Sequence, residues 1–254
     1  MTTLVQAMLE TARLVGVVYE GIATDGTITS LTDTRRTEQA EFFSGGALFI
    51  TSGALAGKVL PITISGTNTI TFPAQTKAVE AGDTYVAITK SIGGIDALKQ
   101  AVLYGLRHYG EIMLSDDTSL TFGSGKEYII PENIKDIRRV EVKDSGGSFV
   151  PNYYWKEIGG MLIFDSEPEA GIARIWYAGI HPTIKETESL NNNTKIEHIK
   201  WLAAEYMWRL LIQTTHKDNN IAIDMLNEAK AEALLAKQAK PRLMPRDPHL
   251  GGKL

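Results

Sequence analysis

Apolar residues along this chain follow two periods, one typical of helices and one typical of strands. In residues 4–15, 94–114, 194–215 and 218–240, apolar side chains recur at three- and four-residue steps, which predicts helices with one buried face. In residues 17–89 and 126–180, β-branched residues and glycine predominate in short runs, which is typical of strands joined by tight turns. This order predicts an α+β protein: a helical core, two β-rich modules and a C-terminal helical hairpin.

The first helix is predicted from the spacing of a capping box. Thr3 precedes Gln6 by three residues, so its hydroxyl can accept a hydrogen bond from the first turn. The helix should end near Val15-Gly16. Its expected apolar face comprises Leu4, Ala7, Met8 and Ala12.

The first β-rich segment predicts short, closely spaced strands, which are typical of a small barrel or sandwich-like module. Turn signals lie at Asp25-Gly26, Ser65-Gly66 and Ala81–Asp83. The predicted strands are Gly21–Leu31, Ala47–Thr51, Val59–Ile64, Thr69–Phe72 and Tyr85–Thr89.

A helix is predicted over Gly94–Leu114, followed by the second β-rich segment. Gly159-Gly160 between two strand-like runs indicates a two-residue hairpin turn. The buried stripe of the helix is expected to be Ile95, Leu98, Val102, Leu106 and Tyr109, and the strands are expected at Ile137–Val142, Tyr153–Ile158, Met161–Asp165 and Ala173–Ala178.

The two last helices should form a hairpin that also serves assembly. Thr194 and Glu197 have the spacing of a second capping box, and Glu205 and Arg209 form an i,i+4 pair. The small residues of the last helix, Ala222, Ala229, Ala233 and Ala236 with Leu226, allow close approach either of the preceding helix or of another subunit. We predict inter-subunit contacts through Ile199, Leu202, Tyr206, Leu210, Leu226, Ala229 and Ala233.

The last fourteen residues are predicted to be an extended arm, because three prolines cannot continue a helix. From Lys237 onward, five basic residues oppose one acidic residue, a surplus of +4. Such an arm can anchor in a partner's groove. Its predicted binding residues are Arg242, Leu243, Met244, Pro245, Arg246, Asp247, Pro248, His249 and Leu250.

These patterns divide the chain into six predicted parts. They are the N-terminal helix (1–16), the barrel or sandwich-like module (17–90), a core helix (91–120), a β-hairpin and sheet module (121–185), the helical hairpin (190–240) and the extended arm (241–254).

Composition narrows the function classes. The net charge of −4, with basic residues dispersed, disfavours tight non-specific DNA binding. The absence of cysteine removes disulfides, thiolate metal sites and a cysteine nucleophile. We expect neither a secretory signal at the N-terminus nor a membrane span, because no apolar run is long enough.

No motif for catalysis is strong. Gly53–Val59 lacks the spacing and the Ser or Thr of a phosphate-binding loop, and is interpreted as a β-turn. The five histidines show no metal-ligand spacing. Carboxylates at Asp116-Asp117 and at Asp165, Glu167 and Glu169 lie in turn-like segments, where solvated loop acids are typical. The aromatic residues Tyr153, Tyr154, Trp155, Trp176 and Tyr177 fit either a packed core, a subunit interface or a stacking surface.

Several segments, taken in order, resemble tailed-phage head–tail connector (neck) adaptor proteins. They are Phe42–Ile50, Ala56–Lys58, Ala81–Tyr85, the helix Ala97–Glu111, Glu127–Pro131, Arg138–Val142, Trp155–Gly160, Ile175–Gly179 and the closing hairpin. The resemblance covers most of the chain.

The resemblance implies a non-enzymatic virion structural protein without a cofactor. Such adaptors form a homo-oligomeric ring, usually a dodecamer, that docks onto the portal protein through C-terminal arms and binds a downstream neck or tail protein. DNA passes through the lumen without specific binding, and no membrane is involved. The implied location is the neck of the virion, assembled in the host cytoplasm.

Three alternatives remain open at this stage. The chain can be another neck or tail component, such as a stopper or tail-completion protein. It can be a glycan-binding tail-associated protein that uses Tyr153–Trp155. The third alternative is a hydrolase that uses Asp165 or Asp116.

Overall fold

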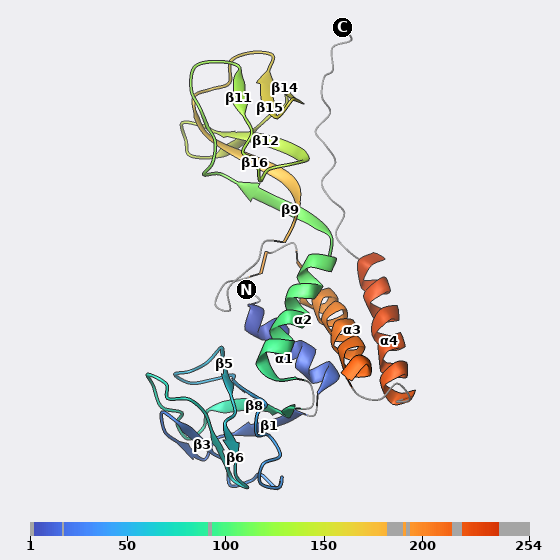
Figure 1. Ribbon diagram of the computed structural model, residues 1–254. Helices are drawn as coiled ribbons and strands as arrows, with labels where there is room; N and C mark the ends of the chain where they lie inside the picture. Colours follow the sequence, from blue (N-terminus) through green and yellow to red (C-terminus); the bar gives the residue numbers. More distant parts are fainter. Residues whose placement is uncertain are drawn as a thin grey trace. The chain divides into compact units, whose positions relative to one another are not determined.

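The computed structural model describes residues 3–16, 18–90, 93–181, 190–191, 194–214 and 220–238 (Figure 1). The chain forms a mixed α+β structure, as predicted, with four helices and several antiparallel sheets among these residues. It divides into two units. Unit 1 contains Met1–Tyr109 and Pro182–Lys240, and unit 2, which contains Gly110–His181, is inserted between them in the sequence.

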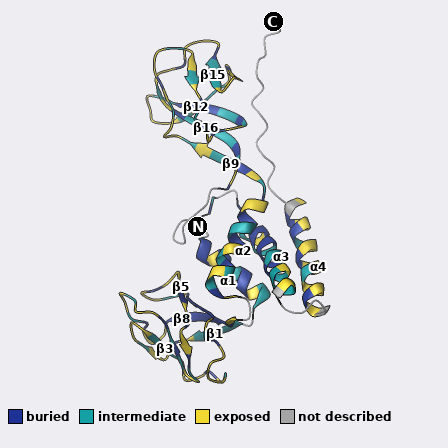
Figure 2. Cartoon of the chain, in the orientation of Figure 1, coloured by how far each residue is buried: buried dark blue, intermediate teal, exposed yellow. Residues whose placement is uncertain are grey.

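Four helices form the helical part of unit 1, and α3 is their centre. Helix α3 packs against α1, α2 and α4. Figure 2 shows buried residues on the facing surfaces of α1, α2 and α3, whereas much of α4 is exposed. The helices are α1 (Leu4–Val15), α2 (Gly94–His108), α3 (Ile196–Thr214) and α4 (Asn220–Gln238).

Helix α1 confirms its prediction. The Thr3 hydroxyl accepts a hydrogen bond from the Gln6 amide at 3.2 Å, and the helix ends at Gly16, whose amide donates to the Ala12 carbonyl. The predicted apolar face, Leu4, Ala7, Met8 and Ala12, is fully buried.

Helix α2 is shorter than predicted. It ends at His108, and Gly110 follows with a positive φ of 89°, a conformation that terminates helices and favours glycine. Residues Glu111–Asp116 instead form strand β9, because they pair with β16 in unit 2. The predicted boundary at residue 120 was therefore about ten residues too late. Of the predicted stripe, Leu98, Val102, Leu106 and Tyr109 are buried and Ile95 is partly exposed.

The second predicted capping box is wrong. Helix α3 begins at Ile196, and the amides of His198 and Ile199 donate to the Lys195 carbonyl. The Thr194 hydroxyl is buried without a hydrogen-bond partner among the described residues. The helix therefore starts too late for Thr194 to cap it.

Two four-stranded antiparallel sheets build the β-rich part of unit 1, in the orders β1-β8-β4-β5 and β2-β3-β7-β6. Both sheets contribute to one core that includes Leu31, Leu48, Ile70 and Tyr85. The strands are β1 (Val18–Ile22), β2 (Asp25–Gly26), β3 (Ser30–Thr32), β4 (Ala47–Ile50), β5 (Lys58–Pro61), β6 (Ile64–Ser65), β7 (Thr69–Thr71) and β8 (Thr84–Ile88).

Two details of this region correct the predictions. Neither described sheet closes on itself, so the predicted barrel is wrong; both sheets contribute residues to one core. Asp25-Gly26 is not a turn but pairs with Leu31-Thr32, and the chain turns at Thr27–Ser30, whose ends are joined by a backbone hydrogen bond. The segment Gly53–Gly57 is a turn between β4 and β5, as predicted.

Unit 2 consists of two antiparallel sheets around a core that includes Phe122, Val140, Trp155 and Phe164. Strand β16 pairs with β9, β10 and β12, and β13 completes this five-stranded sheet beside β12; β11, β15 and β14 form the other. The strands are β9 (Glu111–Asp116), β10 (Thr121–Phe122), β11 (Glu127–Ile129), β12 (Ile137–Lys143), β13 (Phe149–Asn152), β14 (Trp155–Ile158), β15 (Met161–Phe164) and β16 (Gly171–Ile180).

The hairpin turn at Gly159-Gly160 is confirmed. Both glycines have positive φ, 60° and 79°, which a two-residue turn with matching twist requires. Strands β14 and β15 pair directly across it, from Ile158 opposite Met161 to Trp155 opposite Phe164.

Gly105 permits the close approach of α2 and α3. A Cβ placed there would lie 2.9 Å from the Ile199 carbonyl oxygen and 3.2 Å from the Ile199 Cγ2. Both distances are shorter than ordinary van der Waals contact, so any side chain would push the helices apart.

We expect Gly105→Ala to lower the free energy of unfolding by about 1–3 kcal/mol, because overpacking outweighs the gain in helix propensity. The control is Gly66→Ala, where the nearest atom to a new Cβ is 3.6 Å away. Urea denaturation of both variants measures the difference. An unchanged or higher stability for Gly105→Ala would contradict the close packing.

Candidate functional site

The residues predicted to make subunit contacts lie in the helical hairpin, and the structure divides them by exposure. Ile199 and Leu202 are buried where α3 packs on the other helices. Ala229 and Ala233 are buried on α4, which packs on α3. Because these four residues are buried within the chain, a contact with another subunit would have to use more exposed residues nearby.

The remaining predicted contact residues, Tyr206, Leu210 and Leu226, are partly exposed. Tyr206 lies against Tyr104 of α2, with ring centroids 4.9 Å apart. The predicted pair of Glu205 and Arg209 forms an ion pair on α3. These residues border the hairpin surface without forming its most apolar part.

The most apolar exposed part of α4 flanks its buried stripe on both sides. We call Ile221, Met225 and Leu235 the first flank, and Ile223 and Leu234 the second flank, because a helical period places them on opposite edges of the stripe. Ile221 is 72% exposed, Leu234 59% and Leu235 56%. Helix α4 is thus packed on α3 through small residues and offers larger apolar side chains to solvent.

The alanine stripe of α4 predicts a packed face and does not by itself indicate these flanks. The sequence does contain a signal for the flanks, because the apolar surface of this helix is wider than the alanine stripe. Ile221 and Met225 are four residues apart and so share one side of the helix, and Leu234 and Leu235 are adjacent to Ala233 and Ala236.

The predicted binding arm, from Arg242 to Leu250, lies outside the described residues. Its role stays a prediction based on sequence.

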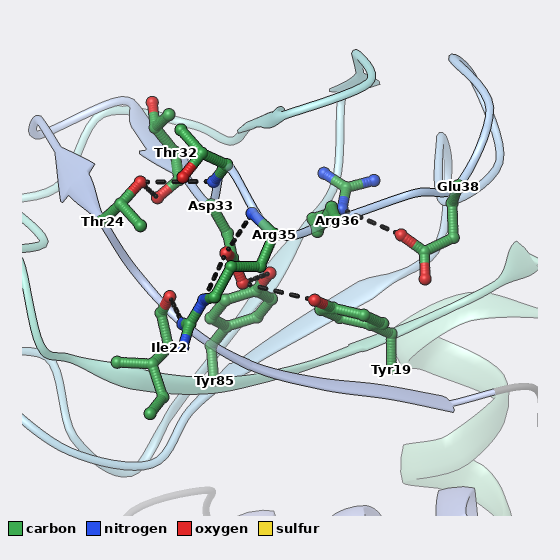
Figure 3. Close-up of polar contacts among 10 residues, drawn as sticks. Tyr19, Ile22, Thr24, Thr32, Asp33, Arg35, Arg36, Glu38 and Tyr85 are labelled. Atoms are coloured by element: carbon green, nitrogen blue, oxygen red, sulfur yellow. Dashed lines mark hydrogen bonds and ion pairs between the residues drawn. The ribbon is translucent and has the colours of Figure 1, made fainter.

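A buried polar cluster in the β-rich part of unit 1 was not predicted (Figure 3). Asp33 follows β3 and has a fully buried side chain. Its Oδ2 accepts hydrogen bonds from the hydroxyls of Tyr85, at 3.0 Å, and Tyr19, at 3.4 Å, and its Oδ1 accepts from the Arg35 amide and Nε. The Arg35 guanidinium also donates to the Ile22 carbonyl. Asp33 thereby joins β1, β8 and the loop after β3.

The electrostatics of the cluster hold Asp33 ionised. Burial alone would raise the pKa of Asp33, but hydrogen bonds from the Arg35 amide, Tyr85 and the Arg35 side chain lower it below its ordinary value. Burial and the negative charge of Asp33 raise the pKa of Tyr85 well above its ordinary value. The tyrosine therefore stays a hydrogen-bond donor, and the carboxylate acts as an acceptor that ties strands together.

Arg36 extends the cluster into the core. Its side chain is fully buried; Nη2 donates to the Ser65 hydroxyl at 3.1 Å, and Nε lies 3.5 Å from a Glu38 carboxylate oxygen. The guanidinium carbon lies 5.2 Å from the ring centroid of Phe43. In sequence, residues Asp33 to Glu38 are typical of a solvated loop. The one signal of a buried cluster is that two arginines lie between two acidic residues, which allows ion pairs within the segment.

A surface hollow of about 450 Å³ lies beside the cluster, and its cations are already paired. Arg13 contacts Glu10 at 2.6 Å and Glu20 at 2.7 Å, and Arg35 contacts Asp33 at 3.2 Å. This pairing makes the hollow a poor anion site.

Three of the acidic residues considered for hydrolysis, Asp116, Asp117 and Glu167, are engaged in hydrogen bonds or an ion pair. Asp116 accepts hydrogen bonds from Thr118 and Ser119, and these bonds outweigh burial and lower its pKa. Glu167 accepts from the Gly125 amide at 3.1 Å, and Asp117 lies 3.4 Å from Arg174. Among the described residues, no group of three or more histidine, aspartate or glutamate side chains is placed to hold a metal ion.

The aromatic candidates separate into core and surface. Trp155 is 4% exposed and belongs to the core of unit 2, whereas Tyr153 and Tyr154 are exposed beside it. The Trp176 indole donates to Glu141 at 3.0 Å. A stacking surface that needs Trp155 is therefore excluded.

Comparison of the sequence with known protein families and with characterised proteins found no match in either. In the part of the chain that the structure describes, no helix has the length and apolar character needed to cross a bilayer.

Tyr85→Phe should lower the free energy of unfolding by about 1.5–3 kcal/mol, because a hydrogen bond to a buried carboxylate is lost. Tyr19→Phe is the matched variant, since it removes a longer bond to the same oxygen and should cost less. Chemical denaturation compares them. Equal stability of Tyr85→Phe and wild type would contradict the structural role of Asp33.

His198 predicts a pH dependence of stability. It is buried against Tyr109, with ring centroids 5.7 Å apart, and burial followed by the charge of Lys195 lowers its pKa below 6.5. The unfolded chain therefore binds a proton before the folded chain does, and stability is lost as the pH falls below 6.5.

The free energy of unfolding should fall with a slope of up to about 1.4 kcal/mol per pH unit, the limit for one proton. His198→Asn should flatten this dependence, and His108→Asn, at an exposed site on α2, should not. Urea midpoints between about pH 7.5 and 5.5 provide the test. Parallel curves for wild type and His198→Asn would contradict it.

Proposed function

We propose that this chain is a virion structural protein, a head–tail adaptor that forms a ring on the portal and joins the capsid vertex to the tail. The observation that carries the proposal is the pair of exposed apolar flanks on α4. Large apolar side chains exposed on both edges of one helix mark a candidate protein contact, in which Glu228 and Glu232 lie between Met225 and Leu235 on the first flank.

The position of the flanks supports a ring in particular. The first and second flanks lie on opposite edges of α4, so one chain can offer its first flank to the second flank of the next. A contact between two different surfaces repeats head to tail, and it closes into a ring when the rotation between subunits divides a full turn.

The sequence supports the other parts of the proposal. An arm with a surplus of positive charge suits an acidic surface on the portal, and simultaneous engagement of many arms offsets the ordering cost of each. A net charge of −4 suits a channel that lets DNA pass, because a strongly basic wall would retain it. The ordered resemblance to neck adaptors agrees with both features.

The exposed flanks of α4 would equally suit another neck or tail component, such as a stopper or tail-completion protein. The two candidates differ in the protein that they bind. Binding to portal-bearing capsids without a tail supports the adaptor, and binding to isolated tails alone supports the alternative.

Ile221→Glu combined with Leu235→Glu should prevent ring formation on portal-bearing capsids, because each subunit would bring charge into an apolar contact. The matched control is Ile64→Glu, at a site 55% exposed on β6. Co-sedimentation with capsids measures binding, and circular dichroism checks folding. Wild-type binding by the folded flank variant would contradict the ring contact.

Truncation after Lys240 should leave the fold intact, because every described helix and strand precedes it. Capsid binding should fall by on the order of a hundredfold, since multivalent engagement of the arms is lost. Undiminished co-sedimentation of the truncated chain would remove the arm from the proposal while leaving the flank contact testable.

A further inference from the structure

Unit 2 carries a groove lined by exposed aromatic residues at the junction of β13 and β14. The groove has a volume of about 310 Å³. Tyr153 and Tyr154, 47% and 54% exposed, stand at its edge. The complete lining comprises Val142, Asp144, Val150, Pro151, Asn152, Tyr153, Tyr154 and Glu169.

The backbone around the two tyrosines is held by local hydrogen bonds. The Tyr154 amide donates to the Asn152 side chain at 3.0 Å, and the Asp165 amide donates to the Tyr154 carbonyl at 3.1 Å. The backbone at Tyr154 is therefore held in place before any ligand binds, which lowers the entropic cost of ordering this edge of the groove.

The charge of the groove is negative. Its two charged lining residues are carboxylates, Asp144 and Glu169. Asp144 accepts a hydrogen bond from the Ser148 amide at 2.8 Å, whereas Glu169 is exposed and forms no ion pair within the described residues. A ligand that combines apolar rings with a positive charge complements this lining.

The chain itself contains such a ligand. Arg242, Pro245 and Pro248 are spaced three residues apart in the last fourteen residues, which contain three of the nine prolines of the chain. A polyproline II helix has three residues per turn, so these three side chains would lie along one edge. Proline-rich segments of this kind bind in grooves lined by aromatic side chains, because the extended segment loses little entropy.

We propose that the groove of unit 2 binds the C-terminal arm of this chain, with Pro245 and Pro248 against the tyrosines and Arg242 beside Glu169. This docking holds the arm on the body of the protein until a partner displaces it. It requires only the groove and the arm, so it stands whether or not the arm binds a portal.

Disulfide trapping in the full chain tests the docking. The chain contains no cysteine, so Val150→Cys with Met244→Cys provides the only disulfide that can form within one chain. Met244 adjoins Pro245, and Val150 lines the groove. The control pair combines Met244→Cys with Ile129→Cys, at a site 79% exposed on β11 outside the groove lining.

We expect the Val150 pair to cross-link about tenfold faster than the control pair, and the preference to disappear in Pro245→Ala, Pro248→Ala. A cross-linked monomer on a non-reducing gel indicates docking within one chain and supports the proposal. Peptide mapping assigns any dimer: a bond between position 150 of one chain and position 244 of another supports docking between copies, whereas bonds that join only the same position of two chains count against the proposal. Equal rates for the two pairs, or a preference that survives loss of both prolines, would overturn it.

A labelled peptide with the sequence of residues 240–254 provides a second measurement. The peptide should bind the full chain in competition with the chain's own C-terminal arm. Tyr154→Ala or Glu169→Lys should weaken peptide binding about tenfold, and an unchanged circular dichroism spectrum should show that each variant is folded. The peptide with Arg242→Glu should bind no better than a scrambled sequence. A glycan-array signal that depends on Tyr154, with no peptide binding, would assign the groove to a sugar and overturn the proposal.

Discussion

The packing of α3 against three other helices is the constraint on which unit 1 depends. Ile199, Leu202, Ala203 and Ala204 are nearly or fully buried, and Gly105 lets α2 approach to backbone contact. Close helix packing through small residues transmits any change in volume directly to the neighbours. The placement of α1, α2 and α4 therefore follows from one helix.

The exposed surface of α4 is a consequence of this packing. Because its alanines face α3, its larger apolar residues are left at the edges of the contact. In the β-rich part, the buried Asp33 carboxylate stabilises the fold in a similar way. Its hydrogen bonds with Tyr19, Tyr85 and Arg35 hold the loop after β3 against strands β1 and β8. Rigid parts with an exposed apolar edge suit a protein that acts by assembly, which is the function proposed above.

Local signals predicted most of the elements, and long-range pairing explains the failures. The caps and stripe of α1, the glycine turn at Gly159-Gly160 and the start of α2 each depend on residues close in sequence. The segment after Gly110 has apolar residues at helical spacing, yet it pairs with β16, more than fifty residues later, so its own sequence does not reveal its state. Asp33 failed to stand out for the same reason, since its partner Tyr85 lies 52 residues away.

Hydroxyl-radical footprinting of α4, in the free chain and in assembled particles, tests the central claim most directly. We expect Ile221, Met225 and Leu235 to react in the free chain and to become protected in the particle, because one subunit covers the flank of the next. Equal reactivity of these residues in both samples, or absence of the chain from purified particles, would contradict it.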